Sequence, residues 1–380
     1  MRTGHFTGLL IAGFIGGLFT AAVVAAETVH FNDFESEAGP AWSTQEIASP
    51  PAENATRFLG RFSEDQNAAL TLTNLPKHTR LRVTLDLHII QTWDGENASW
   101  GPDRWIASVD GRELIRTSFS NADWNNYQYF QNFPGLLASE RFNHRTGADR
   151  MDTLNFENTD EGNERLPLRD ATYQLRMTIA HSADTAELVF RSSGLQELSD
   201  ESWGIDNIRV EALSDDDIEP LTDEQWQRIS RDLSGTDPRK IYDACWLLIE
   251  QGDAGLSRID EVLTGREDSR NARRQHIQQL IDQLNAPEYE TREQAMSDLQ
   301  SQWRLEPDLL TAAAEQPASA EAEWRINQVL RSKERSNTRI DPSTLKVMRM
   351  HRVLELIDTP RAKEMLEASR ARQVNLPTKD

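Results

Sequence analysis

The hydrophobic and polar positions along the chain follow two different periods. Residues 81–89, Leu-Arg-Val-Thr-Leu-Asp-Leu-His-Ile, alternate apolar and polar side chains without a break, which is typical of a β-strand with one buried and one solvated face. In this strand, His88 falls on the face predicted to be solvated. Shorter segments with the same alternation, separated by turn residues, predict about nine strands in all. They cover residues 28–34, 56–62, 68–73, 81–89, 105–110, 113–119, 172–179, 187–191 and 203–210.

A helical period replaces this alternation from residue 221 onward. Apolar residues recur at i, i+3, i+4 and i+7 in two stripes, which must pack on neighbouring helices: Ile277, Leu280, Ile281 and Leu284, then Met350, Val353, Leu354 and Ile357. Helix starts are indicated by capping boxes at Thr222 with Gln225 and at Thr291 with Gln294, and by the pairs Asp237-Pro238, Asp341-Pro342 and Thr359-Pro360. The pattern predicts about eight helices packed as an α-solenoid or an irregular bundle.

Aromatic residues divide the chain at the same place. Residues 27–213 hold 10 Phe, 6 Trp and 3 Tyr, whereas residues 214–380 hold 4 Trp, 2 Tyr and no Phe. Residues 121–170 show little periodicity, and a segment of that length is usually functional or disordered. The predicted division is an antiparallel β-sandwich (jelly roll) over 27–213, a solvated acidic linker over 214–220, an all-α domain over 221–370 and a C-terminal tail over 371–380.

The N-terminal segment has the composition of an export signal. Arg2 is followed by a run without charge over residues 7–26, and Val24 and Ala26 stand at the small-residue positions of a cleavage site. We therefore expect residues 1–26 to be a signal peptide and the protein to be periplasmic, at the cell surface or extracellular. The alternative is an uncleaved anchor, and only then would the protein contact a membrane. The single cysteine, Cys245, excludes an internal disulfide and lies in a helical pattern of apolar residues.

Charge and the absence of catalytic motifs narrow the function. The chain has 41 basic and 62 acidic residues, a formal net charge of −21, so it repels phosphate backbones and nucleic acid is not an expected partner. It contains no GxSxG, HExxH, P-loop or dinucleotide-binding glycine motif and no cysteine cluster. We predict a protein without catalytic activity. A carboxylate-dependent glycoside hydrolase stays as a third alternative, although 62 acidic residues guarantee carboxylate pairs and such pairs therefore do not indicate catalysis.

One loop combines aromatic and acidic side chains. Aromatic rings suit the apolar faces of sugars, and carboxylates suit their hydroxyl edges, so the loop predicts a carbohydrate site at Trp93, Asp94, Trp100, Asp103 and Trp105. Large aromatics more often fill cores, and the alternative is that Trp93 and Trp105 anchor strand ends in the core. Trp100, between Ser99 and Gly101, is expected to be exposed.

A carboxylate lies in the closing strand of the sandwich. Asp206 has the same strand parity as Ile208 and Val210, so we expect it to point into the core with them. Burying it without a partner would cost several kcal/mol, so it needs a cation or several hydrogen-bond donors.

Both halves resemble known families. The N-terminal half resembles the jelly-roll modules of secreted bacterial proteins, similar to concanavalin-like, MAM-like and carbohydrate-binding sandwiches. The matching residues are 31–35, 70–76, 90–95, 101–103, 193–195 and 200–210. The C-terminal half resembles a bacterial HEAT-like helical region at residues 246–248, 252–254, 284–295 and 353–362, and departs from it at residues 302–304, where a glycine is common.

The resemblance implies a function and a metal. In such sandwiches a Glu after the first strand and an Asp in the last strand share a structural Ca²⁺, and the matching residues are Glu35 and Asp206, with Asp33 as a substitute for Glu35. The alternative is that Asp206 only accepts hydrogen bonds. The leading hypothesis is that the sandwich binds carbohydrate or glycoconjugate while the helical domain is a scaffold. The alternative is a structural or assembly protein that binds other envelope proteins.

Overall fold

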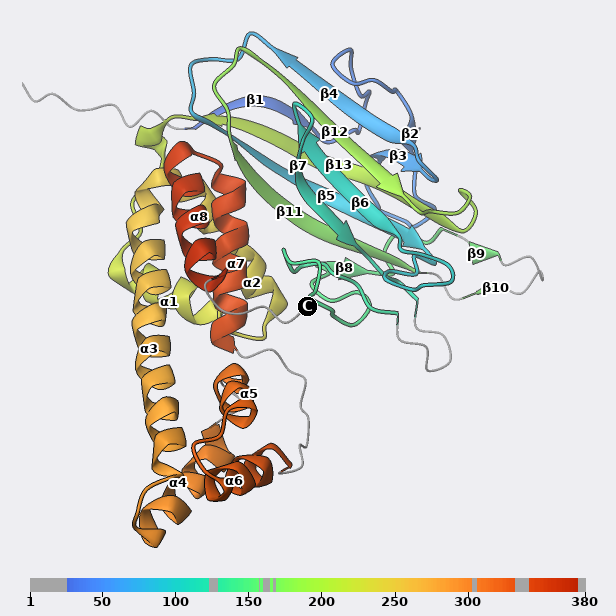
Figure 1. Ribbon diagram of the computed structural model, residues 1–380. Helices are drawn as coiled ribbons and strands as arrows, with labels where there is room; N and C mark the ends of the chain where they lie inside the picture. The colour runs from blue at the N-terminus through green and yellow to red at the C-terminus, as the bar shows by residue number, and fades with distance from the viewer. Residues whose placement is uncertain are drawn as a thin grey trace, which may run out of the picture.

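The computed structural model describes residues 26–122, 129–156, 158–159, 165–166, 169–302, 306–331 and 342–374. The N-terminal part is an antiparallel β-sandwich and the C-terminal part is helical, as the periodicity predicts (Figure 1). The predicted signal segment lies outside the described residues, apart from Ala26. Within the described part of the chain, no helix combines the length and the apolar character that a membrane crossing requires.

Two sheets form the sandwich. The larger has the order β2-β3-β13-β5-β11-β8, with β1 also paired to β13, and the smaller has the order β4-β12-β6-β7. Strands β9 and β10 form a separate pair. The strands are β1 (Glu27–Asn32), β2 (Ile47–Ala48), β3 (Phe58–Phe62), β4 (Asn67–Thr73), β5 (Arg80–Gln91), β6 (Arg104–Val109), β7 (Arg112–Ser118), β8 (Arg150–Met151), β9 (Asn158–Thr159), β10 (Arg165–Leu166), β11 (Asp170–Ala180), β12 (Thr185–Ser193) and β13 (Glu201–Leu213).

A bulge in β13 reverses the predicted direction of Asp206. Asp206 pairs with Asp86 of β5, but the next pair is Arg209 with Thr84, so β13 carries one extra residue here. Asn207 has a φ of 50° at this point. Because an extra residue shifts the alternation of side chains, Asp206 shares the outer face of the sheet with Asp86, while Ile208 beyond the bulge lies in the core. The expectation that Asp206 points into the core with Ile208 is therefore wrong.

His88 lies on the predicted outer face of β5 but is buried. The ring of Phe58 packs on it with the ring centroids 4.8 Å apart, and Nδ1 of His88 lies 2.9 Å from the hydroxyl of Thr172. Phe58 belongs to a small second core with Ile90 and Leu154 on this face. The prediction of a solvated His88 is wrong because Phe58 covers it, and Phe58 in turn packs with Leu154 and Phe156.

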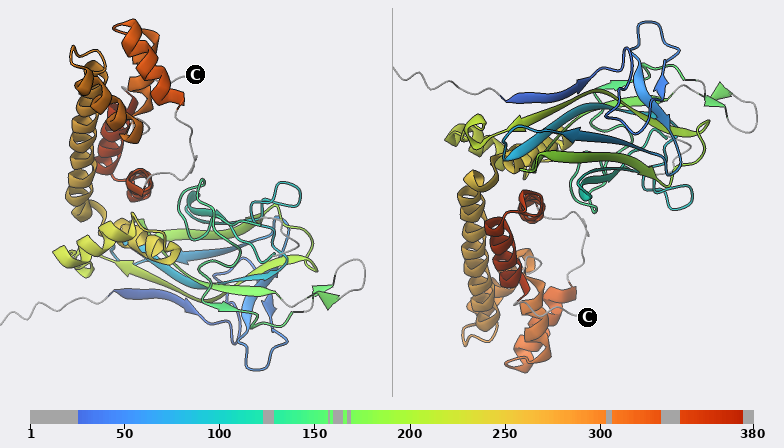
Figure 2. Two further views of the ribbon diagram at one scale, coloured as in Figure 1. Left: turned by 90° about the horizontal axis from the view of Figure 1, so that it is seen from below. Right: turned by 90° about the horizontal axis from the view of Figure 1, so that it is seen from above.

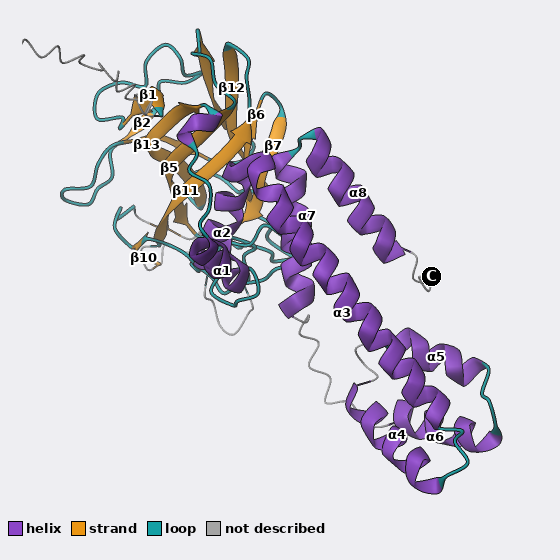
Figure 3. Ribbon diagram, turned by 90° about the vertical axis from the view of Figure 1, so that its left-hand side faces the viewer, coloured by secondary structure: helices purple, strands orange, loops and turns teal. Residues whose placement is uncertain are grey.

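The helices form two packed groups rather than one. They are α1 (Asp223–Asp232), α2 (Pro238–Gln251), α3 (Leu256–Gln283), α4 (Tyr289–Gln302), α5 (Pro307–Glu315), α6 (Ala320–Arg331), α7 (Pro342–Ile357) and α8 (Pro360–Val374), with short 3₁₀ turns η1 (Asp215–Asp217) and η2 (Gly252–Gly255). Helices α1, α2, α7 and α8 and the first part of α3 share one continuous hydrophobic core with the sandwich. The end of α3 packs with α4, α5 and α6 in a separate core. Figure 3 shows this second group at the far end of α3.

The two predicted apolar stripes belong to different cores. The stripe from Ile277 to Leu284 lies on α3 in the distal core, and the stripe from Met350 to Ile357 lies on α7 in the core shared with the sandwich. Thr222 caps α1 through the predicted box, since its hydroxyl accepts from the N–H of Gln225. The box predicted at Thr291 is wrong, because α4 already begins at Tyr289. Asp341 lies outside the described residues.

Helices α2 and α7 lie along one edge of the sandwich, beside the edge strands of the two sheets. Glu250 of α2 accepts two hydrogen bonds of 2.9 Å from Arg82, two from Arg176 and one from Thr178. Burial opposes ionisation, but the two arginines outweigh it and hold the pKa of Glu250 below its usual value. The carboxylate therefore ties α2 to the outer face of the larger sheet. Figure 2 shows the helices extending away from this side.

A second buried ion pair ties α7 to the 129–156 segment. Arg349 donates to Oε1 of Glu140 at 2.6 and 3.0 Å, and their side chains are 3% and 5% exposed. Phe133 of the same segment packs against Tyr242 of α2, with ring centroids 5.4 Å apart. This part of the aperiodic segment is thus built into the junction between the sandwich and the helices.

The acidic run at the junction is not a free linker. Asp215 forms a salt bridge of 2.5 Å with Arg80, and Asp217 accepts from the backbone N–H and the hydroxyl of Ser214 at 2.7 Å. The run is exposed to solvent, as predicted, but its backbone is ordered, because Ser214 and Asp217 form a capping box on the 3₁₀ turn that leads from β13 to α1.

Candidate functional site

The loop between β5 and β6 lies at the end of β5 opposite to Arg82 and the helices. It is closed by its own backbone: the N–H of Asp103 donates to the carbonyl of Gly95 at 2.9 Å, and the N–H of Gly101 donates to Asn97 at 3.2 Å. Gly95 has a φ of +67° and packs so tightly against the carbonyl of Phe130 that a side chain would collide with it. The loop is therefore an ordered part of the sandwich end.

Two carboxylates at this end point into the space between the sheets. Asp103 precedes Trp105 of β6 by two residues, and Glu201 precedes Trp203 of β13 by two residues, so each carboxylate shares the inward direction of its tryptophan. The two rings meet edge to face in the core, with centroids 6.4 Å apart. Asp103 and Glu201 come from different sheets and are both 0% exposed.

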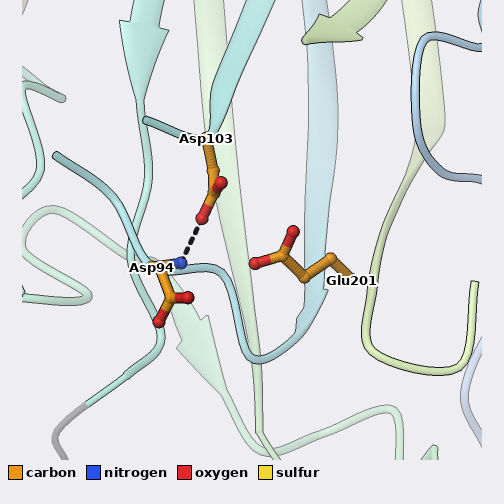
Figure 4. A group of neighbouring side chains, drawn as sticks. All are labelled: Asp94, Asp103 and Glu201. Atoms are coloured by element: carbon orange, nitrogen blue, oxygen red, sulfur yellow. Dashed lines mark hydrogen bonds between the residues drawn. The ribbon is translucent and has the colours of Figure 1, made fainter. Parts of the chain in front are cut away.

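Asp94 completes a group of three carboxylates (Figure 4). One oxygen from each of Asp94, Asp103 and Glu201 lies within 4.8 Å of the other two. Asp103 Oδ2 accepts from the N–H of Asp94 and, at 3.2 Å, from that of Gly95. Glu201 Oε2 accepts from the N–H of Gln196 at 2.8 Å. The three side chains thus come from the end of β5, the start of β6 and the start of β13.

Several oxygens in this group of carboxylates and on residues bonded to it are buried without a hydrogen-bond partner among the described residues. They include the other carboxylate oxygens, Oδ1 of Asp103 and Oε1 of Glu201. The amide oxygen of Gln196 and the hydroxyl of Ser120, the residue bridged to Asp94, are buried and unbonded as well. Buried polar atoms are normally satisfied, so this concentration of unbonded oxygens needs a chemical explanation.

The carboxylates also lack a cationic neighbour. No Lys, Arg or His in the described part of the chain forms a salt bridge with any of the three. Burial raises the pKa of Asp94 to about 7, with a further contribution from the charge of Asp200. Burial raises the pKa of Asp103 and Glu201 as well, and the charge of Asp103 adds to the rise at Glu201. Burial therefore favours the protonated forms of these carboxyl groups, and a bound cation would favour the ionised forms.

This arrangement suits cation binding or a shared proton better than catalysis. A general acid or nucleophile must come within hydrogen-bond reach of the reacting bond. Asp103 and Glu201 have no exposed surface, and only Asp94 is partly open to solvent. A polysaccharide chain cannot reach the two buried carboxylates without displacing the loop.

The tryptophans of the loop divide into two kinds. Trp93 and Trp105 are 0% exposed, and Nε1 of Trp93 donates to the carbonyl of Ser202 at 2.9 Å. Their environment is that of core anchors, and neither ring offers a face to a ligand. Trp100 is 65% exposed, as its place in the loop predicts.

The predicted metal residues lie elsewhere. Asp206 accepts from the hydroxyl of Thr56 at 2.8 Å and from the N–H of Asn207 at 2.7 Å, so both its oxygens are bonded. Glu35 is exposed and accepts from the N–H of Arg57 at 2.8 Å, and the exposed Asp33 accepts from the N–H of Glu35 at 3.2 Å. Burial raises the pKa of Asp206 to about 6, and Glu35 is among the charges that contribute. These two hydrogen bonds therefore satisfy both carboxylate oxygens of Asp206.

The sequence interpretation named Asp94 and Asp103 but missed Glu201. A signal was available: Asp103-Arg104-Trp105 and Glu201-Ser202-Trp203 repeat the order carboxylate, any residue, tryptophan at the starts of two strands. If both tryptophans point inward, both carboxylates must do so too. What the pattern cannot show is that β6 and β13 start at the same end of the sandwich.

The fold is an antiparallel β-sandwich joined to a helical part. No family model matches the chain, and no curated protein matches it. Solved structures that align with about half of it include carbohydrate-binding modules. The CBM22-1 xylan-binding domain of Xyn10C from Paenibacillus barcinonensis aligns at 10% identity and a TM-score of 0.25, covering 50% of this chain and 97% of its own.

Two further structures align over a similar share. TmCBM27, a module solved for specific mannan recognition, has 10% identity and a TM-score of 0.24, covering 50% of this chain and 99% of its own. The K3 adhesin domain of Lys-gingipain from Porphyromonas gingivalis has 11% identity and a TM-score of 0.25, covering 49% and 100%. Scores this low establish neither a shared family nor a shared ligand.

Proposed function

We propose that the protein is an exported, non-catalytic binding protein whose sandwich binds carbohydrate or glycoconjugate through the loop that carries Trp100. The observation that supports this most directly is the exposure of Trp100, whose ring is 65% accessible although large aromatics are usually buried. Aromatic faces stack on the apolar faces of sugar rings, and a single exposed tryptophan often supplies much of the affinity at a binding surface.

The backbone around Trp100 is held in place on both sides. Its N–H donates to Oδ1 of Asn97 at 3.2 Å, and its carbonyl accepts from Nε2 of Gln196 at 2.6 Å. A ring that projects from a fixed backbone loses less freedom when a ligand binds, which favours affinity. Glu96, Asn97 and Arg104 of the same loop supply polar groups suited to sugar hydroxyls.

The test compares two exposed tryptophans. Trp100→Ala should lower the affinity for any glycan found on an array by at least about tenfold, because it removes the stacking surface. Trp324→Ala is the matched control, since Trp324 is 54% exposed on α6 in the distal helical group. Equal affinities for the two variants and the wild type would refute the site, and no glycan bound by the wild type would refute the function.

The remaining parts of the proposal have their own tests. For export, the protein recovered outside the cytoplasm should begin at Glu27. For the absence of catalysis, chromogenic glycosides should not be turned over. Turnover that disappears in Asp103→Asn would instead establish the glycoside hydrolase alternative.

A second candidate function is the binding of an envelope protein by the distal helices. Tyr289 of α4 is 63% exposed and Trp324 of α6 is 54% exposed, and the guanidinium of Arg325 lies 5.8 and 5.9 Å from their ring centroids. Exposed aromatics beside an arginine are typical of protein-binding surfaces. Cross-linking that captures one specific envelope protein and fails in a Tyr289→Ala, Trp324→Ala variant would support this candidate.

A further inference from the structure

We propose that Asp94, Asp103 and Glu201 form a calcium-binding site at the base of the loop that carries Trp100. This site differs from the pair Glu35 and Asp206 that the family resemblance implies. It does not rest on carbohydrate recognition, because it can be tested with the metal ion alone.

The first argument is the balance of charge and hydrogen bonds. Three carboxylates meet within 4.8 Å, and no cationic side chain of the described residues neutralises them. Asp103 Oδ1 and Glu201 Oε1 are buried without a donor, on side chains that have no exposed surface. Burying a carboxylate in this state is costly unless a proton or a cation occupies the place. An acidic cluster alone would not indicate a ligand, but these unbonded, inward-pointing oxygens do.

The second argument concerns which cation fits. The ligand atoms that the three residues offer are all carboxylate oxygens. Gln196, whose N–H donates to Glu201, and Ser120, which is bridged to Asp94, each carry a further buried and unbonded oxygen. No His or Cys belongs to the group, which disfavours zinc and other transition metals. Ca²⁺ accepts six to eight oxygen ligands in loose geometry, whereas Mg²⁺ requires a near-ideal octahedron and keeps its water. An irregular set from three separate segments therefore suits Ca²⁺.

The third argument concerns the segments that a bound ion would join. Asp94 and Asp103 stand at the two ends of the loop, and Glu201 is the first residue of β13, which lies in the same sheet as β5 and in the other sheet from β6. An ion shared by all three would tie both ends of the loop to β13 and fix the base from which Trp100 projects. Calcium binding would thus stabilise the sandwich end and order the exposed ring.

The competing explanation is a proton shared between Asp103 and Glu201. Two carboxyl groups in a buried place cannot both ionise, and one bound proton would let one oxygen donate to the other. The shared proton needs no added ion, so the two explanations differ in their response to calcium.

The experiment measures the melting temperature of the whole chain in calcium and in chelator, together with terbium luminescence excited through tryptophan. At a calcium concentration one hundred times the dissociation constant, we expect the melting temperature of the wild type to rise by about 4 °C. The rise and the terbium signal should disappear in Asp103→Asn and in Glu201→Gln, two variants of nearly unchanged shape. Circular dichroism checks that each variant is folded, and either one alone suffices for the test.

Asp206→Asn is the control for the alternative position. If the site lies at Asp94, Asp103 and Glu201, Asp206→Asn keeps the calcium response. The proposal is overturned if the wild type shows no response, if Asp103→Asn and Glu201→Gln keep the response, or if only Asp206→Asn loses it. A calcium response together with unchanged glycan affinity in Trp100→Ala would refute the carbohydrate site while leaving the calcium site intact.

Discussion

Buried carboxylates near the two ends of β5 differ in whether the chain supplies them with a cationic partner. At the end near Arg82, Glu250 is bonded by Arg82 and Arg176, and at the contact of the 129–156 segment with α7, Glu140 is bonded by Arg349. At the other end, Asp103 and Glu201 are buried with unbonded oxygens and no cationic side chain among the described residues. The chain carries 41 basic residues, so a shortage of cations does not explain the difference.

Under the proposed calcium site, this difference separates carboxylates that hold elements together from carboxylates that bind a ligand. A carboxylate whose partner is supplied by the chain itself contributes to holding elements together. A buried carboxylate whose partner is missing indicates a ligand that the chain does not encode. Substitutions of glutamate by glutamine, which keep shape and remove charge, can test this contrast at several sites.

The largest effect is expected at the pair of Glu140 and Arg349. Arg349→Met leaves the buried carboxylate of Glu140 without its cationic partner and should lower the free energy of unfolding by about 3–5 kcal/mol. The double variant Glu140→Gln, Arg349→Met should recover much of the loss, because no charge stays buried. Urea unfolding of the three proteins measures both values. A single variant as stable as the wild type would show that water enters this part of the junction.

A smaller loss is expected at Glu250. Glu250→Gln removes the charge that holds Arg82 and Arg176, but Arg82 keeps a salt bridge of 3.2 Å to Glu211 and Arg176 is partly exposed. We expect the free energy of unfolding to fall by about 1–3 kcal/mol. Because the carboxylate attracts two cations, the loss should shrink in 1 M salt, and salt-independent values would argue against an electrostatic role.

The pH dependence of stability should reveal His88. Burial lowers the pKa of His88 from 6.5 to about 4, so between these values the unfolded chain binds more protons than the folded one. The contribution of His88 to stability is therefore lost as the pH falls through this window, by about 1 kcal/mol from pH 7 to pH 5.5. Asp206, whose pKa burial raises from 3.8 to about 6, acts in the opposite direction because its folded state takes up the proton. Asp94, Asp103 and Glu201, whose pKa values burial also raises, act in the same direction as Asp206, so His88 is measured as a difference between variants.

The two contributions can be separated by variants. In Asp206→Asn one opposing contribution is removed, so the free energy of unfolding at pH 5.5, relative to that at pH 7, should be lower than in the wild type. Adding His88→Asn should then raise this relative value by about 1 kcal/mol. Identical pH profiles in all three proteins would mean that neither group changes its protonation on unfolding.

The smallest loss is expected at Glu201 when calcium is absent. Burial raises its pKa, so the wild-type side chain must take up a proton on folding at neutral pH, whereas glutamine needs none. The free energy of unfolding of Glu201→Gln in chelator should therefore not fall below that of the wild type. A loss as large as that at Glu250 would show that Glu201 is ionised and matched by a partner, which would remove the contrast between the two ends.

The sequence predicts most of the fold because the strands alternate and the helices carry stripes and caps. Its failures have local causes. The direction of Asp206 is wrong because a bulge at Asn207 shifts the parity, and nothing in a run of alternating residues marks the extra residue. The solvation of His88 is wrong because Phe58 covers it; the ring of Phe58 lies where a side chain on Gly204 would stand.

The candidate site was predicted only in part for a topological reason. Asp94 and Asp103 lie in one loop and could be named from local composition. Glu201 is close to them only because β13 pairs with β5, which places it next to Gln91, three residues before Asp94. Pairing between strands more than a hundred residues apart cannot be deduced from local patterns.

Helix α3 has a mechanical consequence. Its 28 residues make a rod about 42 Å long, anchored in the core of the sandwich at Leu256 and in the distal core at Leu284. Over such a length, a tilt of about 10° at the anchored end displaces the far end by about 7 Å. The exposed Tyr289 and Trp324 lie beyond the far end of α3. A small change in the tilt of α3 beside the sandwich would therefore displace both side chains by several times the displacement at the anchored end.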